Sequence, residues 1–118
     1  MAVFRWAMAP ALTRILKLSM ERGTVDVVVR IFWPEQRENS WFSDWTIGWP
    51  DRERKGSAGG ADAIQALLVA LKFVGTELYC SAEHEAGRLT WADDWSGYGF
   101  PVPGGMRDAL KGDDAAHL

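Results

Sequence analysis

Only one thiol, that of Cys80, occurs in the 118-residue chain, and the imidazole groups are limited to His84 and His117. One cysteine cannot form an intrachain disulfide or supply a cysteine-rich zinc site. The acidic residues lack the D-x-D-x-D-G spacing of a calcium loop, and the histidines lack an H-x-x-x-H spacing. We therefore expect no metal, no other cofactor and no disulfide framework, as suits a reducing, cytoplasmic setting.

Concentrated positive charge and long apolar runs are also missing. The net charge is −3 at pH 7, and the longest basic stretch is the short one at residues 52–55. A protein that binds a phosphate backbone needs a concentrated basic face. Lys72 and Gly75 interrupt the longest apolar run, which falls short of the ~18 apolar residues of a membrane helix. These absences predict a soluble cytoplasmic protein whose partner is neither nucleic acid nor a membrane.

Recognisable catalytic signatures are lacking as well. Cys80 and His84 would share a helix face only if a helix continued past Gly75, and a nucleophile–base pair also needs an orienting group. Residues 56–60 read Gly-Ser-Ala-Gly-Gly before a helix, but they lack the Lys-Ser/Thr ending of a phosphate-binding loop. We therefore predict no catalytic residue and favour a non-enzymatic protein.

What the chain does contain is a clear alternation of side chains before residue 50. Three stretches alternate or are rich in β-branched residues, which predicts strands, and their connections are short. Consecutive strands with short connections imply an antiparallel meander. Residues 88–91 are a candidate short fourth strand, whereas the charged and glycine-rich residues 51–60 are expected to form a flexible loop. The three predicted strands are residues 12–20, 25–32 and 41–49.

The helical signal begins at Asp62, a plausible N-cap residue with Gln65 three positions later, as in a capping box. Apolar residues then recur at the spacing of one helix face, which we expect to pack on the sheet. The predicted fold is α+β, with a three- to four-stranded antiparallel meander sheet packed against one central amphipathic helix. We expect a single domain over residues 1–118, with peripheral tails at residues 1–10 and 113–118. The predicted buried face consists of Ile64, Leu67, Leu68, Leu71, Val74 and Leu78.

Tryptophan is unusually frequent, with seven in the chain. Trp41, Trp45 and Trp49 share one face of the third predicted strand, because alternate residues of a strand point to the same side. We favour a core position for Trp45, since tryptophan fills a small interior efficiently. For Trp41 and Trp49 a core position and an exposed strip that stacks on sugars both stay open.

Large aromatic side chains also gather near two aspartates in the glycine-rich stretch over residues 91–100. Aromatic residues in a loop-rich acidic segment are typical of a binding edge. The alternative is that this segment folds back over the sheet as a lid. The predicted binding residues are Trp91, Asp93, Asp94, Trp95, Tyr98 and Phe100.

Several motifs occur in order along the chain: residues 60–68 (Gly-Ala-Asp-Ala-Ile-Gln-Ala-Leu-Leu), residues 87–91 (Gly-Arg-Leu-Thr-Trp), residues 97–103 (Gly-Tyr-Gly-Phe-Pro-Val-Pro) and residues 112–114 (Gly-Asp-Asp). With these motifs the chain resembles a family of small bacterial domains of unknown function. Trp41 to Ile47 is similar to that family's W-x-C-x-aromatic-x-I strand, with Ser43 where cysteine is frequent. The resemblance implies no established activity or site residue. By analogy, small acidic bacterial domains of this kind resemble immunity and conflict-system proteins, which block a partner protein.

Two functions from different classes follow. The first is a protein-interaction domain of bacterial cytoplasm, of the immunity or conflict-system inhibitor type, whose partner is another protein and whose self-association is left open. The second is a domain that binds or hydrolyses a small, carbohydrate-like ligand with the tryptophan strip and His84.

Overall fold

The computed structural model describes residues 11–118, so the tail expected at residues 1–10 lies outside the described residues. Within them, no helix combines the length and the apolar character needed to cross a membrane. The elements in chain order are β1 (Ala11–Met20), β2 (Gly23–Phe32), β3 (Glu35–Arg37), β4 (Ser40–Trp49), β5 (Arg52–Gly60), α2 (Ala63–Tyr79), α3 (Ala82–Glu85), β6 (Leu89–Thr90), the 3₁₀-helix η1 (Gly104–Ala109) and α4 (Gly112–His117).

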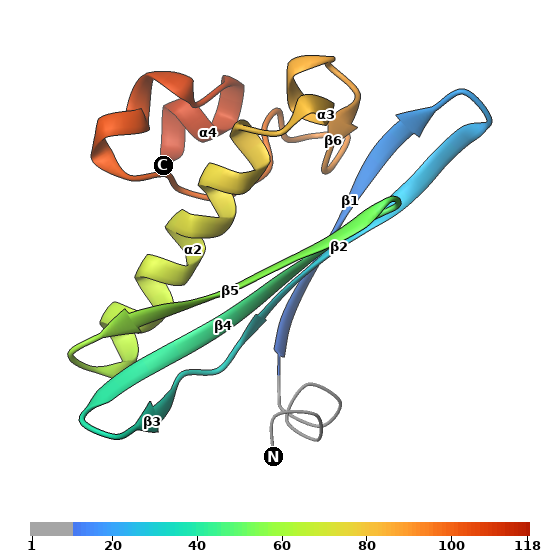
Figure 1. Cartoon of the computed structure of the whole chain (residues 1–118). Helices are drawn as coiled ribbons and strands as arrows, with labels where there is room; N and C mark the ends of the chain where they lie inside the picture. The colour runs from blue at the N-terminus through green and yellow to red at the C-terminus, as the bar shows by residue number, and fades with distance from the viewer. Residues whose placement is uncertain (1–10) are drawn as a thin grey trace.

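The fold is α+β, as predicted, with one main helix on an antiparallel sheet of six strands (Figure 1). β1, β2, β4 and β5 are joined in sequence, and each pairs antiparallel with the next. The short β3 pairs with β4 after β2 has ended, and β6 pairs with the outer edge of β1. The predicted three to four strands were therefore too few.

The sequence did not predict two of the strands, the short β3 and the long β5, and residues 51–60, which include β5, were expected to form a flexible loop. β5 pairs with β4 over its full length, from Arg52 opposite Trp49 to Gly60 opposite Trp41. Small residues are needed there, because a Cβ atom at Gly56 would lie 2.6 Å from the indole ring of Trp45 on the neighbouring strand. Glycine in a strand marks such a close approach, although it weakens the local strand signal.

The helix α2 crosses one face of the sheet and covers the core (Figure 1). Its predicted N-cap is confirmed, since Asp62 Oδ1 accepts a hydrogen bond from the Gln65 N–H at 2.8 Å. The predicted buried face was partly wrong, because Ile64 is 70% exposed and Leu68 is 51% exposed. The small side chains of Ala66 and Ala70 face the core instead, which lets the helix lie close to the sheet. The buried residues of α2 are Ala66, Ala70, Val74, Gly75, Leu78 and Tyr79.

Beyond α2, the last third of the chain gathers near the C-terminal end of that helix (Figure 1). Residues 113–118, expected to be a peripheral tail, belong instead largely to α4, and Asp114 within α4 is fully buried. Gly75 lies where α2 meets this region, because a Cβ atom there would stand 1.9 Å from the carbonyl oxygen of Pro101. Glycine at this position allows the two parts of the chain to touch backbone to backbone.

Candidate functional site

A cleft of about 430 Å³ opens between α3, β6 and the segment that follows β6. α3 contributes His84, β6 contributes Thr90, and the following segment contributes Asp93 and Trp95. Lys111, the residue before α4, also lines the cleft, which therefore combines aromatic surface with charges of both signs. Concave sites with a few placed polar groups are the usual form of a binding site.

Four of the six predicted binding residues lie at or near the surface beside this cleft. Asp93 and Asp94 are exposed, and Trp91 and Trp95 are half-buried. The indole rings of Trp91 and Trp95, four residues apart in the chain, pack edge to face with their centroids 6.0 Å apart. We call these four residues the acidic rim.

The other two predicted binding residues are part of the core. Tyr98 and Phe100 are each only 4% exposed and pack with the sheet and α2. Their burial means that residues 91–100 are both lid and surface, with the acidic rim outside and the two later aromatic rings inside.

A single carboxylate fastens this segment to the rest of the protein. Asp114 is 0% exposed and accepts four hydrogen bonds. The Tyr79 hydroxyl and the Trp95 indole N–H donate at 2.5 and 2.7 Å, and the backbone N–H groups of Tyr98 and Gly99 donate at 2.8 Å each. A carboxylate offers about four acceptor positions, so Asp114 is saturated. The orientation of Trp95 on the acidic rim is therefore set by a buried charge.

Arg14 holds the same segment from the sheet side. Its guanidinium donates to the carbonyl oxygens of Tyr98 and Gly99 at 3.1 and 2.8 Å. The guanidinium carbon also lies 3.9 Å from the centroid of the Trp91 ring, a cation–π contact. Burial lowers the pKa of Arg14, and the charge of Asp114 opposes that change. Arg14 therefore fixes Trp91 in the way that Asp114 fixes Trp95.

The floor of the cleft is a cluster of aromatic groups. His84 Nδ1 contacts the Tyr98 hydroxyl, and the His84 ring packs edge to face on both Tyr79 and Tyr98. Burial lowers the pKa of His84, with Lys111 adding to the effect and Glu85 opposing it. Burial, and then the charge of Asp114, raises the pKa of Tyr98 to about 12. At neutral pH the floor is therefore uncharged.

Among the described residues, the His84 ring has no hydrogen bond to Ser96 or Cys80, and the hydroxyl that it contacts is that of the buried Tyr98. Ser96, the serine that lines the cleft, accepts a hydrogen bond from the Asp113 N–H through its hydroxyl. Cys80 and His84 are not on one helix, because α2 ends at Tyr79 and α3 begins at Ala82. Within residues 11–118, no group of three or more potential metal ligands converges. The cleft is suited to binding, through aromatic contact and complementary charge.

The tryptophan strip expected as a possible sugar platform is not exposed. Trp45 and Trp49 are each 5% exposed and belong to the core between the sheet and α2, and Trp41 is half-buried. The core position favoured for Trp45 is confirmed. Stacking of a sugar on this row of rings would require removal of the helix that covers it.

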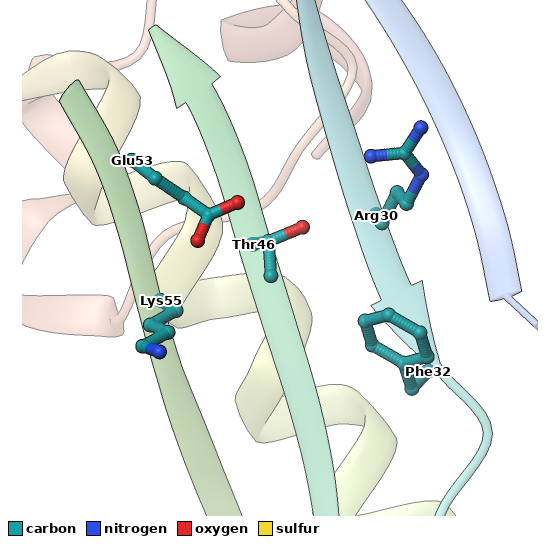
Figure 2. Close-up of a pocket in the computed structure, with 5 residues that line it drawn as sticks. All are labelled: Arg30, Phe32, Thr46, Glu53 and Lys55. Carbon is teal, nitrogen blue, oxygen red and sulfur yellow. The ribbon is translucent and has the colours of Figure 1, made fainter. Parts of the chain in front are cut away.

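The opposite face of the sheet carries a smaller hollow of about 240 Å³ (Figure 2). Thr46 lies in its middle, paired in register with Arg30 of β2 and with Lys55 of β5. Glu53, two residues before Lys55, and Phe32 complete the lining. The hollow is a charged depression in the open face of the sheet, away from the acidic rim.

Sequence reasoning missed three residues of the site, Arg14, Lys111 and Asp114, and it named His84 only for the alternative ligand-binding function. Asp114 had one signal, because it closes the Gly-Asp-Asp motif at residues 112–114. Arg14 had none, since it is separated by more than eighty residues from the carbonyl groups that it binds.

Comparison with known protein families identifies the family of the chain. The model of domain of unknown function DUF6968 matches residues 12–102, and the chain belongs to this family. No curated protein and no solved structure matches the chain. The matched range includes the sheet, α2 and the acidic rim, whereas Lys111 and Asp114 follow it.

Proposed function

We propose that this chain is a non-enzymatic protein-interaction domain that binds another protein through the acidic rim and the adjoining cleft. The observation that carries the proposal is the anchoring of the rim. Two exposed carboxylates and two half-buried indoles lie on a segment that Asp114 and Arg14 hold by five hydrogen bonds, and a sixth hydrogen bond joins Asp114 to Tyr79 of α2. A surface that is already ordered loses little conformational entropy on binding.

The chemistry of the rim favours a basic partner. Tryptophan is enriched among the residues that dominate binding energy, and charged groups around it set orientation and association rate. Asp93 and Asp94 are exposed beside the two indoles, and Lys111 lies across the cleft. A partner with a cationic patch and an apolar or aromatic side chain for the cleft satisfies both features.

The finer assignment is an inhibitor of the immunity or conflict-system type, which acts in the bacterial cytoplasm by covering a functional surface of its partner. An acidic rim on a small rigid domain suits that role, because long-range attraction accelerates capture of a basic target.

The test uses two double variants with the same change in charge. Asp93→Asn with Asp94→Asn removes the rim carboxylates, whereas Glu21→Gln with Asp108→Asn removes two exposed carboxylates outside the rim. The wild type and both variants are used to capture partners from an extract of the source organism, and captured proteins are then titrated in purified form. We expect one basic protein to be retained by the wild type and the control and lost by the rim variant.

The purified complex should also associate more slowly as salt increases, because exposed charges are screened beyond about 8–10 Å at physiological ionic strength. A partner that binds the rim variant and the wild type equally, with equal salt dependence, would show that the interface lies elsewhere.

A further inference from the structure

Within the described residues 11–118, only part of the outer edge of β1 has a neighbouring strand. β6 pairs with this edge at Lys17 and Leu18, and the Ser19 N–H donates to the Arg88 carbonyl at 2.9 Å. Among residues 11–118, nothing pairs with the backbone of residues 11–16 on the same edge. Roughly half of β1 therefore ends the sheet without a neighbouring strand.

The register identifies which backbone groups point outward. Polar backbone groups of alternate strand residues point to the same edge. Because the Ser19 N–H points toward β6, the N–H and C=O groups of Thr13 and Ile15 point out from that edge too. Unpaired edge groups of this kind are a template for another strand.

A groove of about 500 Å³ lies beside the same half of β1, on the face of the sheet that carries α2, and its lining is mainly apolar but includes the part-buried Arg14. Leu12 of β1 and Leu71 of α2 line this groove, and Phe100 and Pro101 from the segment after β6 line it as well. Leu12 is 43% exposed although it is a large apolar residue. A strand added at the edge would direct every second side chain toward this groove.

The apolar surface continues beyond the groove along α2. Leu68 and Ile64 precede Leu71 by three and seven residues, so they lie on the same side of the helix. They are 51% and 70% exposed.

The other face of the added strand would meet positive charge. Arg30 is opposite Thr13 in the β1–β2 register and is exposed. In Figure 2 its guanidinium extends on the side of β2 that faces β1. An acidic side chain opposite Thr13 on an added strand, on the same face of the sheet as Arg30, would lie within reach of the Arg30 guanidinium.

We propose that an extended segment of a partner protein, in which apolar side chains alternate with acidic ones, adds to the free edge of β1 as an antiparallel strand. β6 already uses the edge in this way at Lys17 and Leu18, and its chain turns away at the Ala92–Trp95 bridge. Backbone hydrogen bonds provide affinity in such strand addition, and the pockets for alternate side chains provide specificity. This surface is distinct from the acidic rim, and the proposal does not depend on the rim.

The test begins with selection from a displayed library of random octapeptides against the full chain. We expect enriched peptides to alternate apolar and acidic residues. A synthetic enriched peptide is then titrated against Thr13→Pro, which removes the outward N–H, and against Thr13→Val, which keeps it. Edge strands tolerate proline where the N–H faces outward. Binding should weaken about tenfold or more with Thr13→Pro, through the lost hydrogen bond and the steric block, and change little with Thr13→Val.

Amide hydrogen exchange on the wild-type chain gives a second readout that needs no variant. The Thr13 and Ile15 amides should exchange rapidly in the free chain and become protected by the peptide, and a peptide N-methylated at alternate residues should not protect them. The proposal is overturned if no peptide is enriched, or if the enriched peptide binds Thr13→Pro and the wild type equally. Protection of these amides in the free chain also overturns it. Protection at every protein concentration would show that the chain's own residues cover the edge, and protection that rises with concentration would show a second copy.

Discussion

The sheet with α2 and the segment that follows β6 are held in place by different forces. Between the sheet and α2, the contact is a continuous apolar layer in which Leu16, Ile47 and Leu78 are each 0% exposed. Residues 91–118 add Tyr98, Phe100 and Leu110 to that layer, but their path is set by polar contacts around Asp114. Apolar packing tolerates small adjustments, whereas a saturated buried carboxylate requires its donors at fixed positions.

This difference explains why the segment that follows β6 can be rich in glycine and still keep a defined path. Gly97 has a φ of +102°, and a Cβ atom there would lie 2.4 Å from the carboxyl carbon of Asp114. Gly97 therefore has two roles. It adopts the positive φ of the turn, and its lack of a Cβ atom leaves room for the Asp114 carboxylate beside the backbone N–H groups of Tyr98 and Gly99.

The largest effect is expected from the anchor. Asp114→Ala leaves four donors without an acceptor, of which the Tyr79 hydroxyl and the Tyr98 N–H are buried, and we expect it to lower the free energy of unfolding by about 3–5 kcal/mol. Chemical denaturation measures the change, with Asp108→Ala as the control because Asp108 is an exposed aspartate in the neighbouring η1. Equal midpoints for the two variants would mean that the hydrogen bonds at Asp114 do not hold the segment.

The next largest effect on the free energy of unfolding is expected in the apolar layer, where two leucines of α2 can be compared. Leu78 is 0% exposed and Leu68 is 51% exposed. Leu78→Ala should lower the free energy of unfolding by about 2–5 kcal/mol, as buried leucine truncations do. Leu68→Ala should change it by less than about 0.5 kcal/mol, as most surface substitutions do. Similar losses at both positions in denaturant titrations would place Leu68 in the core and reverse the observed face.

Elements that depend on a local sequence pattern could be predicted, whereas elements that depend on contacts with distant residues could not. β1, β2, β4 and the Asp62 cap were predictable, because each depends on a local pattern within about ten residues. β5 was missed because its small residues suit the Trp45 ring on β4 rather than a strand pattern of their own. The helix face was misjudged because hydrophobicity alone favours Leu68 over Ala66, whereas close approach to a sheet favours the smaller side chain.

The candidate site was predictable in composition and not in geometry. The acidic and aromatic character of residues 91–95 is local, so the sequence pointed to this surface. Its anchors are Arg14 and Asp114, which join residues far apart in the chain through backbone carbonyl and amide groups. The spacing of apolar and polar residues does not reveal such long-range contacts. A buried aspartate such as Asp114 also cannot be told from an exposed aspartate by its neighbours in the sequence.

A smaller effect tests the junction of the two regions. A methyl group at Gly75 would meet the Pro101 carbonyl oxygen, whereas one at Gly105 has no neighbour within 4 Å. Gly75→Ala should therefore lower the free energy of unfolding by about 1–3 kcal/mol, the usual range for overpacking, despite the better helix propensity of alanine. Thermal unfolding of both variants gives the comparison, and a stabilised Gly75→Ala chain would show that Pro101 moves away freely.

The smallest effect is the pH dependence that His84 adds to the floor of the cleft. Burial lowers its pKa below the ordinary value of 6.5, so the folded chain binds a proton less readily than the unfolded chain. The unfolded state therefore holds more protons once the pH falls through 6.5, and stability decreases from there toward acid until the folded-state pKa is passed.

One proton limits the slope of this loss to about 1.4 kcal/mol per pH unit, and solvent around the partly exposed ring reduces it well below that limit. His84→Asn keeps a polar group near the position of Nδ1, beside the Tyr98 hydroxyl, but does not titrate. The free energy of unfolding of the wild type should thus fall more steeply between pH 7 and about 5 than that of His84→Asn. Parallel curves for the wild type and His84→Asn would mean that His84 binds a proton equally well in the folded and the unfolded chain. In that case the cleft floor would not disfavour the charged form of His84.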